Sequence, residues 1–246
     1  MVHATSNIGT LMPALSPSQI QLFRHNGFLR LPSVLPDERV EELKNAIWQD
    51  INNEVEPVVR NADGQVVRIS NAIDRAPIFY QVATHDLVLD PLESLLGPNI
   101  ELIKNRHNHA TLRTKTEKEG GLHRDVKQWS RTIFTIIFYL EETNLENGCT
   151  RIVPGTHHLP GTGGSLYDMA WANELNDQIL PVPMPKGGML VIDSMLVHGP
   201  GKNTTPDTRM SMTMGYHSVD EINDVPNPKR VVVRGDGIYN GNDQIY

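Results

Sequence analysis

From residue 100 onward, short β-rich segments alternate with glycine, proline and asparagine, and this pattern constrains the fold most. Eight such segments follow one another: 100–113, 131–141, 150–153, 180–184, 188–193, 195–198, 208–217 and 230–234. Many short strands separated by turn residues are typical of a β-sandwich or β-barrel. The sequence therefore predicts a mainly β core.

The N-terminal part has the signals of helices instead. Residues 16–19 (SPSQ) predict a helix start, because the serine can cap, proline suits the first helical position and glutamine completes a capping box. This helix should end near Asn26 and Gly27, because glycine tolerates the left-handed conformation. A short strand at 28–31 and a second helix at about 36–52 follow, the latter with apolar residues at steps of three or four. The segment 54–75 is polar and irregular, apart from 66–69 (VVRI). One or two further helices are expected within 78–96.

We expect a single folded domain over 16–246, preceded by a flexible arm at 1–15. Within it, a helical layer at about 16–98 should pack on a β-core at about 99–235. A chain of 246 residues fits one such domain. A domain of this size buries enough surface to need no disulfide, and Cys149, the only cysteine, cannot form one within the chain.

Composition argues against several kinds of partner. The formal net charge is −7 and no run of Lys and Arg forms a basic stripe, which disfavours nucleic acid. Residues 1–15 lack the charged start and apolar stretch of a signal peptide. The longest apolar run, 132–140, is about half the length needed to span a bilayer. We therefore expect a cytoplasmic protein whose partner is a small molecule; its oligomeric state is left open.

Two histidines and an aspartate predict a metal site. His123 and Asp125 are two residues apart, so on a strand they share one side. His198 stands at the end of a strand–corner–strand segment, GGMLVIDSMLVHG. Two imidazoles and one carboxylate form the facial triad of non-haem Fe(II) oxygenases, with open positions on the metal. The alternative is a surface H-x-D pair and a structural histidine.

A second group predicts a site for an acidic cosubstrate. Arg209 follows His198 by eleven residues, and Ser211 lies two positions further on. Residues two apart on a strand point the same way. A guanidinium and a hydroxyl so placed can together bind a carboxylate.

At four motifs, in the right order, the chain resembles the phytanoyl-CoA dioxygenase family of Fe(II)/2-oxoglutarate oxygenases. The front motif is LSPSQIQLFRHNGFLRLPSVLPDERVEEL, and LHRDVKQW surrounds the first histidine. LEETNLENGCTRIVPGTHH follows it, and KGGMLVIDSMLVHGPGKNTTPDTRMSM contains the second histidine. Together these motifs span most of the chain.

The resemblance implies a double-stranded β-helix (jelly-roll, cupin-like) core with flanking helices. It assigns Fe(II) to His123, Asp125 and His198, which are then the catalytic centre. It assigns the distal carboxylate of 2-oxoglutarate to Arg209, with Ser211 as a helper, and O2 as the second cosubstrate. Related halide-transferring enzymes have Gly or Ala in place of the aspartate. Asp125 therefore favours hydroxylation, or another oxidation, over halogenation.

The strand before the first motif carries further candidates. Arg113 lies about where the family often keeps a basic or polar pocket residue, and one of Asn105, His107 and Asn108 can contact the cosubstrate. We take Asn108 and Arg113 as candidate cosubstrate-binding residues. The alternative is a polar strand face without a role in binding.

The chain departs from the family pattern at three positions. Leu122 and Arg124 stand where many members have an aromatic residue and glutamine. Arg124 is expected to point away from the iron. Ile137 stands where many members place a tryptophan close to the cosubstrate, so that stacking contact is expected to be replaced.

Two other motifs that the sequence resembles are excluded, because residues that they require are missing. The sequence HRDVK resembles a protein-kinase catalytic loop, but Ser130 stands where that motif needs asparagine, and its glycine-rich loop and D-F-G are missing. The sequence GPGKN at 199–203 lacks the spacing and the Ser or Thr of a P-loop. A jelly-roll binding protein or a cofactor-independent isomerase remains the alternative, since fold alone does not dictate function.

The substrate is not readable from these motifs. Scattered basic residues argue mildly against acyl-CoA thioesters, and we expect a small natural-product intermediate or amino-acid-like metabolite. Gln128 and Trp129 are candidates for the substrate pocket, with core packing as the alternative. The glycine-rich segment 161–176 predicts either a lid over the site or an ordinary surface loop.

Overall fold

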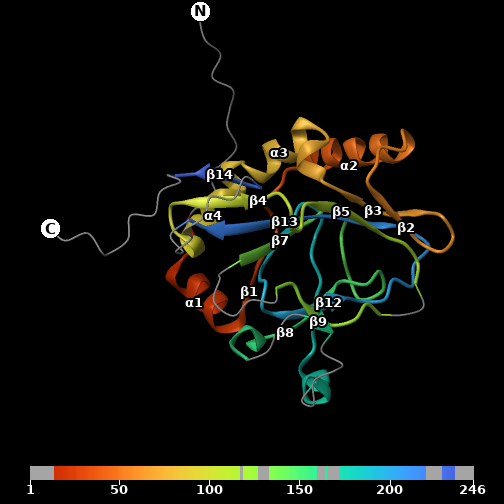
Figure 1. The fold of residues 1–246 in the computed structure, drawn as a ribbon. Coiled ribbons are helices and arrows are strands. Elements are labelled where there is room, and N and C mark those ends of the chain that lie inside the picture. Colours follow the sequence, from red (N-terminus) through yellow and green to blue (C-terminus); the bar gives the residue numbers. More distant parts are fainter. Residues whose placement is uncertain are drawn as a thin grey trace, which may run out of the picture.

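Two antiparallel β-sheets form the centre of the protein, and helices cover the outer side of the larger sheet (Figure 1). The computed structural model describes residues 14–116, 119–126, 133–159, 164–165, 172–219 and 229–235. The predicted N-terminal arm lies almost wholly outside these residues. Among the described helices, none is long and apolar enough to cross a membrane.

The first helix begins and ends where its capping residues predict. Ser16 and Gln19 form the expected capping box, and Gly27 ends the first helix with φ 80°. The four α-helices are α1 Pro17–Asn26, α2 Asp37–Asn52, α3 Pro77–Ala83 and α4 Asp86–Leu96. Short 3-10 helices are η1 Ala72–Asp74, η2 Thr156–His158 and η4 Ala172–Gln178.

The larger sheet has nine strands, with the central path β1-β11-β7-β13-β5-β3-β2. Strand β4 pairs with β13 and with β14. Its strands are β1 Phe28–Leu31, β2 Val58–Arg60, β3 Val66–Ser70, β4 Ile100–Ile103, β5 His109–Arg113, β7 Ile133–Tyr139, β11 Met189–Asp193, β13 Arg209–Ser218 and β14 Arg230–Arg234. Three of these strands, β1 to β3, come from the segment predicted to be a helical layer, and β2 was not predicted. The division into arm and domain stays a prediction.

The smaller sheet has five strands in the order β10-β8-β12-β6-β9 and lies opposite the larger one (Figure 1). Its strands are β6 His123–Arg124, β8 Thr150–Val153, β9 Gly164–Ser165, β10 Leu180–Val182 and β12 Val197–Pro200. Each β segment predicted between 100 and 234 contains a strand within its described residues. The first segment, 100–113, divides into two strands, β4 and β5.

Alternation along the central strands separates two interiors. On β7, Phe134, Ile136 and Phe138 belong to the main apolar core that the helices also enter. The residues between them, Thr135 and Ile137, face a cavity between the two sheets. Because successive side chains on a strand point to opposite faces, one strand serves both interiors. The helices thus hold the large sheet from behind and leave its other face free to form a site.

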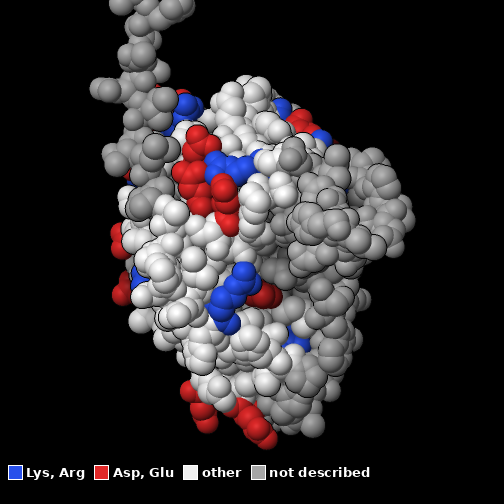
Figure 2. All heavy atoms as spheres, turned by 90° about the vertical axis from the view of Figure 1, so that its left-hand side faces the viewer, with Lys and Arg blue, Asp and Glu red and all other residues white. Residues whose placement is uncertain are grey.

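The C-terminal strand is held to the helical layer by charge. Arg234 on β14 donates to Asp86, Asp90 and Glu93 of α4 at 2.6–2.7 Å. Figure 2, viewed from the side of α4 and β14, shows a mixed cluster of basic and acidic groups in the upper part of this face. Exposed pairs of this kind each contribute about 0–1 kcal/mol.

Candidate functional site

His123, Asp125 and His198 converge although 75 positions separate the first from the last. Strand β6 pairs with β12 in a register that sets His198 opposite His123. The two imidazole rings have centroids 4.7 Å apart. Asp125 lies one residue beyond β6, where its backbone N–H donates to the carbonyl of Ser194 at 2.9 Å.

The three side chains present their ligand atoms to one point. Nε2 of His123 is 3.6 Å from Oδ1 of Asp125, and Nε2 of His198 is 3.5 Å from Oδ2. One ligand atom from each of the three residues lies within 4.8 Å of the other two. This spacing suits a single ion bound between them.

Backbone carbonyls select the tautomer of both histidines. Nδ1 of His123 faces the carbonyl of Gly121 at 3.0 Å, and Nδ1 of His198 faces that of Leu196 at 2.9 Å. A carbonyl only accepts, so each Nδ1 must carry the hydrogen and donate. In the neutral imidazole, Nε2 then keeps its lone pair and points into the site, as metal-binding histidines require.

Asp125 is held as a carboxylate. Thr135 donates its hydroxyl to Oδ2 at 2.7 Å and shares a hydrogen bond with the hydroxyl of Ser194 at 2.9 Å. Burial by itself raises the pKa of Asp125, but His198 and His123 lower it more, so the net pKa is well below the usual range. The hydrogen bond with Asp125 raises the pKa of His123, and burial, which lowers it, offsets this increase only in part.

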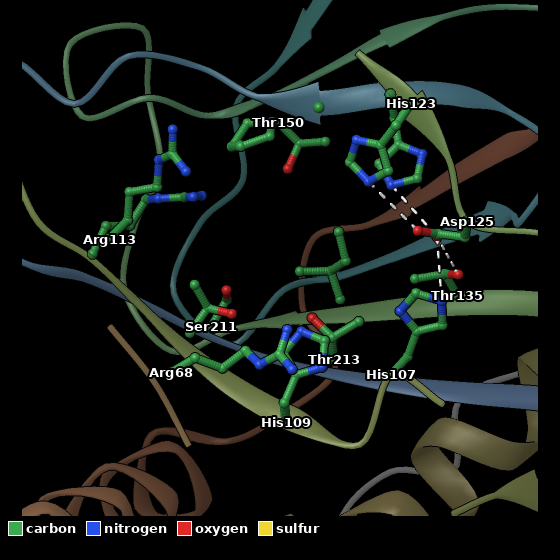
Figure 3. Close-up of a pocket in the computed structure, with 16 residues that line it drawn as sticks. Arg68, His107, His109, Arg113, His123, Asp125, Thr135, Thr150, Ser211 and Thr213 are labelled. Carbon is green, nitrogen blue, oxygen red and sulfur yellow. Dashed lines mark hydrogen bonds and ion pairs between the residues drawn. The ribbon is translucent and has the colours of Figure 1, made fainter. Parts of the chain in front are cut away.

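A cavity of about 430 Å³ opens beside these residues, between the two sheets (Figure 3). Most of its lining residues are polar, and they come from both sheets. The lining residues are Arg68, His107, His109, Thr111, Arg113, His123, Asp125, Thr135, Ile137, Thr150, His198, Gly199, Pro200, Arg209, Ser211 and Thr213.

Two arginines lie side by side in this wall. Arg209 on β13 pairs in register with Arg113 on β5, and Ser211 lies two positions further along the same face. Nε of each arginine is buried without a hydrogen-bond partner. Within the part of the chain that the structure describes, neither guanidinium forms an ion pair. Burial lowers the pKa of both, and Arg209 lowers that of Arg113 further. An acidic ligand would neutralise this pair.

Asn108 is not brought into the cavity. Its amide donates to the carbonyl of Lys104 at 3.0 Å and accepts from the N–H of Ile73 at 2.8 Å. The reason is alternation: His109, Thr111 and Arg113 face the cavity, so Asn108 points the other way. The amide serves backbone groups on the helical side, and we do not propose it as a cosubstrate ligand.

The remaining positions considered in the sequence lie in different parts of the structure. Arg124 points away from the metal residues and donates to the carbonyls of Thr156 and Leu159. Ile137 is part of the cavity wall. Gln128, Trp129 and most of 161–176 lie outside the described residues.

The sequence interpretation missed Arg68, His109 and Thr111, and it did not single out His107. Nε2 of His107 is 3.6 Å from Oδ2 of Asp125 and is buried without a hydrogen-bond partner. Its backbone has a φ of 52°, unusual for a residue other than glycine. Burial lowers its pKa to about 4. The alternation of polar residues in HATLR was the signal that could have found the inward positions of β5.

Comparison with known proteins agrees with this geometry. The phytanoyl-CoA dioxygenase (PhyH) family model matches residues 23–211. The human peroxisomal phytanoyl-CoA dioxygenase is 23% identical over 240 residues, which cover 84% of this chain and 69% of that protein. Ectoine dioxygenase of Bordetella parapertussis is 23% identical over 89% of this chain and 80% of its own length.

Solved structures show the same fold. EctD from S. alaskensis with bound Fe has a TM-score of 0.72 at 20% identity and covers 83% of this chain and 77% of its own. The epimerase SnoN, solved with Fe3+, alpha ketoglutarate and nogalamycin RO, has a TM-score of 0.69 at 20% identity over 88% of this chain and 98% of its own. The predicted jelly-roll fold is therefore confirmed.

The jelly-roll core and the His-Asp-His cluster define the class, an Fe/2-oxoglutarate-dependent oxygenase fold. The chain belongs to the phytanoyl-CoA dioxygenase (PhyH) family.

Proposed function

We propose that this protein is an Fe(II)- and 2-oxoglutarate-dependent dioxygenase that oxidises an unactivated C–H bond of a small organic substrate. The observation that carries the proposal is one cavity that holds both the clustered ligand atoms of His123, Asp125 and His198 and the guanidinium of Arg209, which pairs with no carboxylate of the described residues. A protein that only binds a small molecule does not need the three metal-binding residues and the arginine together.

The residues fit the metal. Two imidazole nitrogens and one carboxylate suit Fe(II), and carbonyl hydrogen bonds hold both rings with Nε2 facing inward. Asp125 is ionised and oriented by Thr135, so it can bind without first losing a proton. His123, Asp125 and His198 would hold the iron.

The residues also fit the cosubstrate. Arg209 would bind the distal carboxylate of 2-oxoglutarate, with Ser211 donating a hydroxyl and Arg113 adding a second cation beside it. When bound, iron and 2-oxoglutarate supply the oxidising chemistry, in which O2 is consumed and succinate and CO2 are released. The protein's part is to orient these groups.

Hydroxylation is the outcome we propose, because Asp125 keeps a carboxylate among the metal ligands. Similar structures are described as an epimerase and a carbocyclase, so the fold itself accommodates other reactions. The many polar side chains of the lining support a small natural-product intermediate or an amino-acid-like metabolite as the substrate.

The test is a visible charge-transfer band on anaerobic addition of Fe(II) and 2-oxoglutarate. We expect the band in the natural protein and its loss in Asp125→Ala. His158→Ala is the matched control, since this histidine lies outside the cavity and contacts the carbonyl of Arg24. Absence of both the band and iron binding in the natural protein would favour the alternative, a jelly-roll binding protein.

A further inference from the structure

The cavity wall carries an excess of positive charge. Among the described residues, its lining includes three guanidiniums, those of Arg68, Arg113 and Arg209, and a single carboxylate, Asp125. The whole chain has a net charge of −7, so this excess is local. A ferrous ion would add two positive charges, and dianionic 2-oxoglutarate would remove two. The loaded site would therefore still be cationic.

Strand register separates His109 from the proposed cosubstrate site and sets Arg68 midway between the two. Along the ladder between β5 and β13, Arg113 lies opposite Arg209, and His109 lies opposite Thr213 four residues further on. Strand β3 joins this ladder at the other edge of β5, with Arg68 opposite Thr111. At about 3.4 Å per residue, His109 lies roughly 14 Å along the strand from Arg113. One small diacid does not occupy both ends.

Arg68 and His109 form a second polar pair in the wall. Figure 3 shows the Arg68 side chain extending toward the His109 ring. Nε of Arg68 donates to the hydroxyl of Ser70 at 3.3 Å, and no carboxylate pairs with its guanidinium in the described parts of the chain. Burial, and then the nearby charge of Arg68, lowers the pKa of His109 to about 4, so the ring is neutral at pH 7 and can donate one N–H.

Other positions of the wall also offer polar groups. Thr111, Thr150, Ser211 and Thr213 contribute hydroxyls. A volume of about 430 Å³ lies toward the lower end of small-molecule sites, which range over roughly 300–1,000 Å³. Part of that volume would be taken by 2-oxoglutarate.

We propose that the substrate carries an anionic group, a carboxylate or a phosphate, and that Arg68 and His109 bind it. This inference rests on the proposed oxygenase function and names the substrate class of the same site. A charge-assisted hydrogen bond from Arg68, with a second from His109, would fix one end of the molecule. The C–H bond to be oxidised would then face the cluster of His123, Asp125 and His198.

The experiment measures anion binding directly, without turnover. The protein is loaded with Zn(II), a redox-silent substitute for iron, and with saturating 2-oxoglutarate. Acetate, inorganic phosphate and acetamide are titrated separately, and the histidine ring signals are followed by NMR. Acetamide is the neutral isostere of acetate. The variants are Arg68→Gln and the matched control Arg60→Gln, whose arginine lies on the same hairpin and donates to the carbonyl of Gly64.

We expect acetate or phosphate to bind at least tenfold more tightly than acetamide. Arg68→Gln should lose at least tenfold of that affinity, while Arg60→Gln keeps it. The tighter of the two anions identifies the acid class. Anions that bind no better than acetamide, or an Arg68→Gln variant that binds them as the natural protein does, would overturn the inference.

The charge-transfer band distinguishes this failure from failure of the proposed function. Arg68→Gln should retain the band with Fe(II) and 2-oxoglutarate, because Arg113 and Arg209 are intact. A natural protein without the band overturns the oxygenase proposal, whatever the anion titrations show. A normal band with no anion preference overturns only the substrate class.

Discussion

Replacing Arg209 by methionine should separate stability from cosubstrate binding. The guanidinium is buried, with 6% of the residue exposed, and its Nε has no hydrogen-bond partner among the residues that the structure describes. Burial lowers its pKa, while Tyr139, Cys149 and Glu141 oppose that effect only in part. Without an anionic ligand, the charge is therefore a cost to the folded state. Methionine has a similar length and no charge, so Arg209→Met should leave the ligand-free protein as stable as before, or more stable.

The affinity of Arg209→Met for 2-oxoglutarate, in contrast, should fall. Removing the arginine leaves the distal carboxylate of 2-oxoglutarate without its main partner, which costs about 2–5 kcal/mol. That corresponds to a dissociation constant raised roughly 30-fold to several thousand-fold. Arg113 remains beside the vacated position, so the lower half of this range is expected. Arg209→Lys should fall between, because lysine keeps the charge but loses the bidentate geometry.

Two measurements on the same protein check this reasoning. Calorimetric unfolding without ligand reports stability, and anaerobic titration of the Fe(II) protein with 2-oxoglutarate reports affinity. The natural protein should gain several degrees in Tm on adding 2-oxoglutarate, and Arg209→Met should gain little. An unchanged affinity in Arg209→Met would refute the assignment. A large drop in its ligand-free Tm would refute the claim that the buried charge is unpaired.

Four further predictions concern the metal residues. His123→Ala and Asp125→Ala should abolish stoichiometric Fe(II) binding and turnover, measured by metal analysis and succinate release; full activity in either would exclude the triad. Thr135→Val should keep the fold but weaken Fe(II) binding by roughly 10–100-fold, because Asp125 loses its orienting hydroxyl; an unchanged Fe(II) affinity would count against that role. Protons should compete with Fe(II) at His123, whose pKa is raised, so metal affinity should fall as pH drops through that raised value. In the metal-free protein, low pH should instead be favourable, because protonated His123 beside Asp125 stabilises the folded state. This contribution is fully present below the unfolded pKa of about 6.5 and is lost as pH rises through the raised folded pKa. A series of Tm values of the metal-free protein against pH measures it.

Local signals in the sequence predicted much of the fold. The capping box at Ser16 and the left-handed Gly27 placed the ends of α1, because a helix terminus is satisfied by residues a few positions away. The β-rich segments after residue 100 were found for a similar reason, since alternation and turn residues act over a few positions. The β2–β3 hairpin was missed in part, because the flanking segment is polar and only 66–69 showed a strand pattern.

The residues of the site also divide into those that local signals predicted and those that such signals did not mark. His123 and Asp125 were found because they are close in the chain, and His198 and Arg209 because their motif is specific. Asn108 was selected for its polarity, but strand alternation turns it toward the helices. Arg68 was not singled out, since nothing nearby in the sequence marks it.

The sequence by itself determined the kind of chemistry available: two imidazoles, one carboxylate and a distant guanidinium, carried on short strands. Only the tertiary structure decided which of these groups meet, and that Arg113 and Arg68 join the same cavity. The physical reason is range. Caps, turns and alternation depend on neighbours, whereas the register that sets His198 opposite His123, or Arg113 opposite Arg209, depends on pairing between segments far apart in the chain.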